Sequence, residues 1–107
     1  MLKKRVLFFT STRADYGILQ DLMRQLKEHP SFELLTLVTG AHLSSSYGAS
    51  LQEIINDGMP ISERVEIDVL SNSGVGTAKS TGLAIIGFAD AITRLSPDMI
   101  VLLGDRF

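Results

Sequence analysis

The chain has 107 residues, with ten basic and twelve acidic side chains, so its formal charge of -2 offers no strongly basic surface to a nucleic acid. It contains no cysteine, which excludes disulfide frameworks, cysteine nucleophiles, zinc ribbons and iron–sulfur clusters. The apolar run from Gly82 to Ala89 is far shorter than the roughly twenty residues that a membrane-spanning helix needs, so we expect no membrane association. The composition is that of one soluble domain.

The first elements alternate between strand and helix. Val6–Phe9 is a continuous apolar run, typical of a strand buried on both faces, and it is too short for the core of a signal peptide, which favours a cytoplasmic protein. Apolar residues at helical spacing then predict an amphipathic helix from Asp15 that ends before Pro30, because proline disfavours helical geometry in the preceding residue. Phe32–Val38 is predicted to be a second strand.

The next elements are shorter. Ser50 and Glu53 fit a capping box, which predicts a short helix that starts at Ser50 and ends near Asp57. Apolar residues alternate with acids over Val65–Val69, as in a strand that has one wetter side, and this pattern favours a place near the edge of a sheet.

A long helix and a last strand complete the chain. The helix is predicted over Thr77–Leu95, and it is apolar on nearly every face between Leu83 and Ala89, so we expect a second protein surface to cover it. Gly82 and Gly87 within it favour close packing at such an interface. Met99–Leu103 is a continuous apolar run and is predicted to be a central parallel strand.

The order β-α-β-α-β-α-β predicts an α/β fold, a Rossmann-like, doubly wound parallel sheet with helices on both faces. Residues 1–107 are read as a single, incomplete N-terminal domain, because the last strand is followed by no helix that could cover it. Ligands of such sheets bind at the carboxyl ends of the strands.

Three segments follow strands at this edge and could bind a ligand. The segment from Ser11 to Gly17 offers hydroxyls, a helix N-terminus and the guanidinium of Arg13, which together predict a phosphate site. The alternative is that Asp15 caps the helix while Arg13 is solvated. His42 follows the second strand and could contact a sugar hydroxyl or be structural.

Asp105 and Arg106 follow the last strand, where acid–base work or phosphate contact takes place in this architecture, or where the pair could organise the loop. Asp105 is the best catalytic candidate. Gly74-Val75-Gly76 matches no nucleotide fingerprint, and we expect a flexible entry to the helix, with a lid over a ligand as the functional alternative.

Taken together, the segments Ser11–Gly17, Leu37–Leu43 and Leu95–Phe107 closely resemble the N-terminal region of hydrolysing UDP-N-acetylglucosamine 2-epimerases, enzymes of sialic acid synthesis. The resemblance implies the first part of the N-terminal domain of a GT-B fold, with the C-terminal domain absent. It also implies loss of UDP by elimination across C1 and C2 of the sugar, followed by hydration to N-acetylmannosamine, without cofactor or metal. A further implication is a homo-oligomer, dimer or tetramer, formed through the region Lys79–Leu95.

Carried over by position, Arg13 would contact the diphosphate, Asp105 would be an active-site carboxylate, and Asp15, His42 and Arg106 would line the substrate site. Gly17 stands where animal relatives have serine, so a nucleotide contact there would come from its backbone N–H. Another UDP-sugar, such as a diacetamido-trideoxy sugar, and a non-catalytic nucleotide-sugar-binding domain are the alternative interpretations. The 107 residues alone are expected to be inactive.

Overall fold

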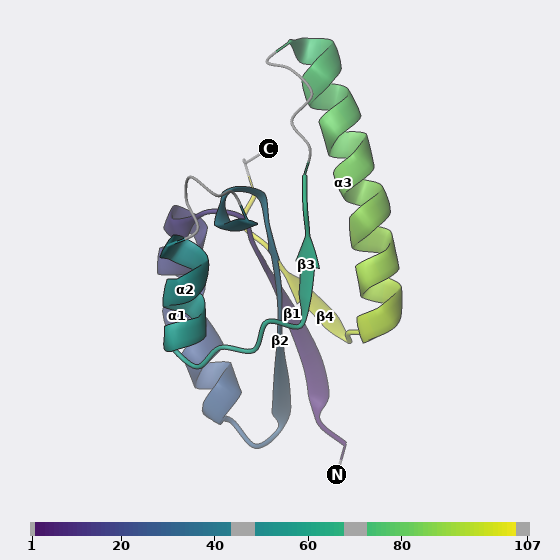
Figure 1. Ribbon diagram of the computed structural model, residues 1–107. Helices are drawn as coiled ribbons and strands as arrows, with labels where there is room; N and C mark the ends of the chain where they lie inside the picture. Colours follow the sequence, from purple (N-terminus) through teal and green to yellow (C-terminus); the bar gives the residue numbers. More distant parts are fainter. Residues whose placement is uncertain (1, 44–48, 68–72, 105–107) are drawn as a thin grey trace.

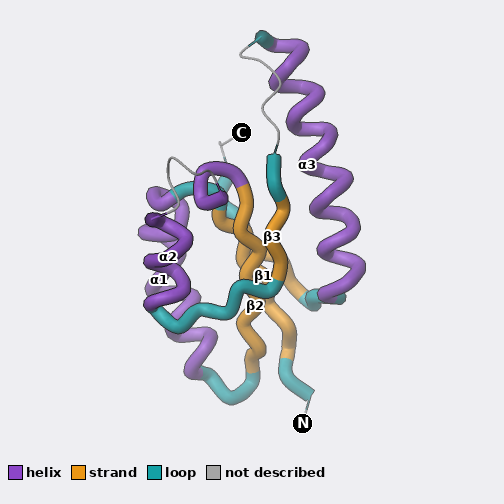
Figure 2. Tube along the Cα trace, viewed as in Figure 1, coloured by secondary structure: helices purple, strands orange, loops and turns teal. Residues whose placement is uncertain are grey.

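A parallel four-stranded sheet forms the centre of the molecule (Figures 1 and 2). The computed structural model describes residues 2–43, 49–67 and 73–104. The strands are β1 (Lys4–Thr10), β2 (Phe32–Thr39), β3 (Glu63–Val65) and β4 (Met99–Val101), and they lie in the order β3-β2-β1-β4. Every neighbouring pair is parallel, so the predicted fold class is confirmed.

Helices cover both faces of this sheet. The helices α1 (Arg13–Glu28) and α2 (Ala49–Asn56) pack on one face, and α3 (Gly74–Leu95) packs on the other (Figure 1). β1 serves both layers, because successive side chains of a strand point to opposite faces. The core under α1 and α2 contains Val6, Phe8, Tyr16, Leu19, Met23, Leu34, Val38, Ile54 and Met59, and the core under α3 contains Leu7, Leu35, Leu37, Val65 and Ala91.

The predicted starts of α1 and α2 are wrong, as is that of α3, which begins at Gly74 and not at Thr77. α1 begins at Arg13, two residues before the predicted start, because Thr12 is the N-cap: its side chain accepts the N–H of Asp15 at 3.1 Å. α2 begins at Ala49, so Ser50 lies inside the helix and the predicted capping box does not form its start. The end of α1 is confirmed, because its C-cap residue, immediately before Pro30, has an extended backbone.

The prediction for Gly74-Val75-Gly76 as a flexible entry or lid is also wrong, because these residues form the first turn of α3. The hydroxyl of Ser73 accepts the N–H of Gly76 at 3.0 Å and caps the helix. The strand predicted over Val65–Val69 ends at Val65, and Val69 lies outside the described residues. Its predicted place at a sheet edge is confirmed.

Within the described residues, β4 does not take the central place that its apolar run predicts. Within the described part of the chain it pairs only with β1 and forms the second edge of the sheet. Met99 and Leu102 are each 59% exposed, because no described element packs over this end of the sheet. A continuous apolar run therefore indicates side chains made for burial, but it does not show which residues bury them.

α3 projects beyond the carboxyl ends of the strands (Figure 1). Its apolar side chains on the outer surface are exposed, with Val75 at 66%, Leu83 at 50% and Ile86 at 63%. The second protein surface that is expected to cover this helix stays a prediction. Gly82 and Gly87 of this helix differ, because Gly87 packs on β3 while Gly82 has open space around it.

Alanine substitutions at these glycines are expected to have opposite effects. A Cβ at Gly87 would lie 2.7 Å from Cγ1 of Val65, a stiff β-branched side chain, so Gly87→Ala should lower the free energy of unfolding by about 1–2 kcal/mol despite the better helix propensity of alanine. Gly82→Ala meets nothing within 4 Å and should raise it by up to about 1 kcal/mol. Urea denaturation followed by circular dichroism would measure both. A Gly87→Ala variant as stable as Gly82→Ala would contradict the close contact.

Candidate functional site

The carboxyl ends of the strands meet a cavity of about 220 Å³. It lies between the ends of β1, β2 and β4 and the middle of α3. In the sheet, β2 and β3 lie on one side of β1 and β4 lies on the other, so the strand order reverses at β1. Ligands of doubly wound sheets bind at such a switch point, which makes this edge the candidate site.

The cavity has one apolar side and one polar side. Aromatic and aliphatic side chains of β1, α3 and the segment after β4 form the first: Phe9, Ile85, Phe88, Leu102 and Leu103. Hydroxyls and one carboxylate form the second: Thr10, Ser11, Asp15, Thr39 and Thr81. Such a mixed wall suits a ligand that carries both hydroxyl groups and apolar carbon surface, as a sugar does.

Asp15 contributes the carboxylate to this wall from the first turn of α1. Its side chain is buried, at 4% exposed, and its Oδ2 accepts a 2.7 Å hydrogen bond from the hydroxyl of Ser11. An acid in the first turn stabilises the positive end of the helix dipole. The N–H groups of Asp15 and Tyr16 are already bonded to Thr12, so the protein's own groups partly satisfy the predicted anion site.

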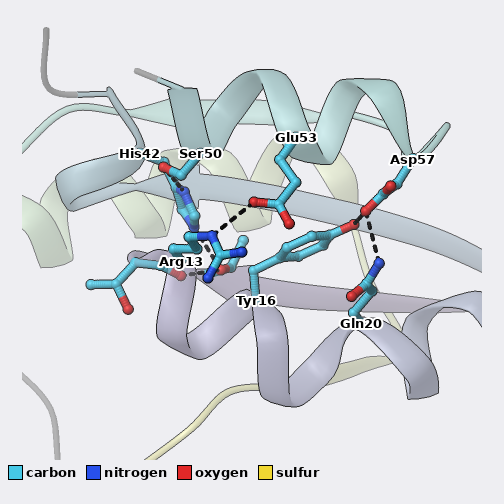
Figure 3. Close-up of polar contacts among 9 residues, drawn as sticks. Arg13, Tyr16, Gln20, His42, Ser50, Glu53 and Asp57 are labelled. Atoms are coloured by element: carbon cyan, nitrogen blue, oxygen red, sulfur yellow. Dashed lines mark hydrogen bonds and ion pairs between the residues drawn. The ribbon is translucent and has the colours of Figure 1, made fainter. Parts of the chain in front are cut away.

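Arg13 lies beside this wall, in the first residue of α1, and its side chain is 75% exposed. Its Nε donates a 3.1 Å hydrogen bond to Oε2 of Glu53 on α2 (Figure 3). Within the described residues its two Nη groups have no hydrogen-bond partner. The guanidinium is thus held through one nitrogen while its outer donors can meet an anion.

His42 is fully buried and does not reach the cavity. It belongs to a short 3-10 helix, η1 (Gly40–Leu43), that follows β2. Its Nε2 lies 2.8 Å from the hydroxyl oxygen of Thr10, and its Nδ1 lies 2.9 Å from that of Ser50 (Figure 3). Both ring nitrogens therefore bind protein groups, and His42 lies behind the polar wall.

The state of His42 should make stability depend on pH. Burial is the main cause that lowers the pKa of His42, while Asp15, the Thr12 backbone and Glu53 oppose this effect. As the pH falls through about 6.5, the unfolded chain takes up the proton first, so the free energy of unfolding should decrease. Denaturant titrations between about pH 7 and pH 5 would measure the decrease. His42→Gln should reduce this dependence, whereas the same change at the exposed His29 should retain it; equal slopes in both variants would contradict the prediction.

Gly40 and His42 together hold the start of the β1–α1 connection. The N–H of His42 donates to the carbonyl of Ser11 at 3.3 Å. Gly40 has a φ of 57°, and a Cβ there would lie 3.1 Å from both the Cβ and the carbonyl oxygen of Ser11. Glycine is required here both by its conformation and by the close approach of Ser11.

A second contact joins α1 to α2. The hydroxyl of Tyr16 donates a 2.5 Å hydrogen bond to Oδ2 of Asp57, which also accepts a 2.8 Å bond from Gln20 (Figure 3). Burial, together with the hydrogen bond to Asp57, raises the pKa of Tyr16. This contact lies away from the polar wall of the cavity and has no place in the predicted site.

The structure brings Arg13, Asp15 and His42 to one edge of the sheet, but they face different surroundings. Asp15 lines the cavity, Arg13 is beside α2, and His42 is behind Thr10. Asp105 and Arg106 lie outside the described residues. Gly17 lies beyond the first turn of α1, and backbone N–H groups at such positions donate within the helix. The backbone N–H of Gly17 is therefore not placed to make the nucleotide contact expected from it.

Sequence reasoning missed the roles of Thr10, Ser50 and Glu53 as partners of His42 and Arg13. The position of Thr10 at the end of a strand is the one signal that pointed toward the site.

In residues 2–43, 49–67 and 73–104 no group of three acidic or histidine side chains could hold a metal ion. The helices described there include none that is long and apolar enough to cross a bilayer.

A family model described as UDP-N-acetylglucosamine 2-epimerase matches residues 24–107, which is most of the chain. The chain belongs to this family. The resemblance is thereby confirmed at the level of the family, and two of the three segments that carry it, Leu37–Leu43 and Leu95–Phe107, lie within the matched residues.

Among curated proteins, the chain is 32% identical over 103 residues to the UDP-N,N'-diacetylbacillosamine 2-epimerase (hydrolyzing) of Legionella pneumophila, with 96% of this chain and 27% of that protein covered. It is 33% identical over 107 residues to the GDP/UDP-N,N'-diacetylbacillosamine 2-epimerase (hydrolyzing) of Campylobacter jejuni, with 100% and 28% covered. The chain thus spans about a quarter of the length of these epimerases.

The crystal structure of the UDP-GlcNAc 2-epimerase from Neisseria meningitidis bound to UDP-GlcNAc has the same fold over this region. Its TM-score is 0.73 at 16% identity, and the match covers 95% of this chain and 26% of that chain. The four-stranded sheet of this chain therefore has the same Rossmann-like fold as the matched region of that epimerase.

Proposed function

We propose that the protein containing this chain is a hydrolysing 2-epimerase that converts UDP-N-acetylglucosamine and water into N-acetylmannosamine and UDP. Residues 1–107 would be part of the N-terminal Rossmann-like domain of a GT-B fold, and the site would be completed by a second domain. The observation that carries the proposal is the family match over residues 24–107, which covers the ends of β2 and β4 and the wall from α3, but not the end of β1. The hydrolysing reaction is supported by the names of the Legionella and Campylobacter relatives.

The residues at the strand ends suit an elimination that releases a diphosphate. In the first step a base takes the proton from C2 of the sugar, the C1–O bond breaks, and its electron pair leaves with UDP. In the second step water supplies a hydroxyl to C1 and a proton returns to C2 on the opposite face. The outer donors of Arg13 would stabilise the charge that grows on the leaving diphosphate, and Asp105 would take part in the proton transfers.

UDP-N,N'-diacetylbacillosamine is the second candidate substrate, because both curated relatives described above are named for it. It differs from UDP-N-acetylglucosamine by an acetamido group at C4 and a methyl group at C5. An apolar wall with Phe9, Ile85 and Phe88 could bind either sugar, so the substrate has to be tested directly.

The test is to incubate the complete protein with each UDP-sugar and to follow UDP and the free sugar by NMR. Free N-acetylmannosamine would support the first substrate, and a free diacetamido sugar would support the second. UDP-N-acetylmannosamine without free sugar would contradict hydrolysis. Binding of UDP without any turnover of either substrate would favour a non-catalytic nucleotide-sugar-binding domain.

A homo-oligomer that associates through Lys79–Leu95, in the cytoplasm, is part of the same proposal. It is supported by the exposed apolar side chains Leu83 and Ile86, since exposed apolar surface marks interaction sites. Light scattering of the complete protein would measure its mass. A monomer would contradict the association.

A further inference from the structure

The buried side chain and backbone of His42 join three segments around Arg13, namely β1, the β1–α1 connection and α2. The imidazole of His42 is bonded on one side to Thr10, the last residue of β1, and on the other to Ser50 in α2. Its backbone N–H is bonded to the carbonyl of Ser11. All of these groups are buried or nearly so, apart from the backbone of Ser11, so the contacts are shielded from competing water.

The elements joined by His42 are those that place Arg13 (Figure 3). Ser11 precedes the helix cap, Thr12, so the position of Ser11 sets where α1 begins and where Arg13 leaves the backbone. Glu53 follows Ser50 by one helical turn, so the position of Ser50 sets where the carboxylate meets Nε of Arg13. The guanidinium therefore has two supports, one from β1 and one from α2.

We propose that His42 is a positioning residue: it fixes the β1–α1 connection and α2 relative to each other and so sets the place of the Arg13 guanidinium for a diphosphate. This inference rests on the proposed function, because it takes Arg13 as the group that meets the diphosphate. His42 itself touches no ligand, since it is fully buried and is absent from the cavity wall. Its effect on binding therefore passes through the groups that it holds in place, and Arg13 is the one proposed to meet the diphosphate.

Two conservative variants test the role without removing the histidine. Thr10→Val and Ser50→Ala each remove one hydroxyl that bonds the ring. In the complete protein, isothermal titration with UDP should show a dissociation constant about three- to tenfold higher in Thr10→Val and Ser50→Ala. The KM for the UDP-sugar should rise with it, while kcat changes less.

The decisive measurement is a double-mutant cycle with Arg13→Ala. If His42 acts through Arg13, Ser50→Ala should have little further effect on UDP affinity once Arg13 has been replaced. Equal effects in the two backgrounds, or an unchanged dissociation constant in Ser50→Ala, would overturn the positioning role. Tyr16→Phe is the matched control, because it removes another hydroxyl bond between α1 and α2 and should lower thermal stability without changing UDP affinity.

Failure of the proposed function gives a different result. In that case the wild-type protein binds no UDP, and the positioning role falls with the function. If the wild-type protein binds UDP and turns over the UDP-sugar while Ser50→Ala lowers only the melting temperature, the function stands and His42 is merely structural. A raised dissociation constant that depends on the presence of Arg13 supports both.

Discussion

Replacing Asp105 by asparagine in the complete protein is expected to lower turnover of the UDP-sugar by a factor of about 10² to 10⁴. Asparagine has nearly the same shape as aspartate but cannot take up or release a proton in this pH range, so acid–base steps would be lost. Affinity for UDP should change little, because Asp105 is assigned to the sugar end of the substrate. NMR of the reaction mixture and isothermal titration with UDP would measure the two quantities separately.

Asp98→Asn is the matched control for this experiment. Asp98 precedes β4 at the amino end of the strand, where its Oδ2 accepts the N–H of Arg5 at 2.8 Å. It belongs to the opposite edge of the sheet, so its replacement should leave turnover unchanged. Turnover retained in Asp105→Asn, or lost to the same extent in Asp98→Asn, would contradict the catalytic role of Asp105.

The sequence alone could predict the sheet, because the signals for its strands are local. The apolar runs of β1 and β2 and the proline after α1 act within a few residues of where they stand. The start of α1 was harder to predict, because Ser11, Thr12 and Asp15 are all residue types that cap helices. The choice of Thr12 depends on which hydroxyl reaches the N–H of Asp15, and this is decided by the geometry at the end of β1.

The candidate site was predicted in part. The order of the elements predicts that a ligand binds at the carboxyl edge of the sheet, and Arg13 and Asp15 lie at this edge because they directly follow β1. The surroundings of His42 could not be predicted, because Thr10 lies 32 residues and Ser50 lies 8 residues away in the chain. A histidine that follows a strand looks the same in sequence whether it faces a ligand or is buried behind one.

The place of β4 shows a further limit of sequence patterns. Its apolar run is as continuous as that of β1, but Met99 and Ile100 are exposed in the described part of the molecule. Side-chain type reports the burial for which a strand is suited, and the neighbouring elements determine whether it is buried. The exposed side chains at this edge are consistent with further structure beside β4, as the proposed two-domain protein requires.

Arg13→Ala is expected to weaken the binding of UDP to the complete protein by about 10- to 100-fold, because a charge-assisted, forked contact to a diphosphate contributes about 1.5–3 kcal/mol. Arg13→Lys should lie between the wild type and Arg13→Ala, since lysine retains the charge but not the planar fork. Stability should hardly change, because the ion pair with Glu53 is largely exposed.

Arg24→Ala is the control for this second change. Arg24 lies on the same helix and pairs with Asp21 at 3.6 Å, so its replacement removes the same charge from α1 but away from the strand ends. Isothermal titration should show wild-type affinity for UDP in Arg24→Ala. Equal losses in Arg13→Ala and Arg24→Ala would mean that the net charge of α1, and not a specific contact, attracts the nucleotide. Unchanged affinity in Arg13→Ala would place the diphosphate elsewhere in the protein, because no other guanidinium extends from the first turn of α1.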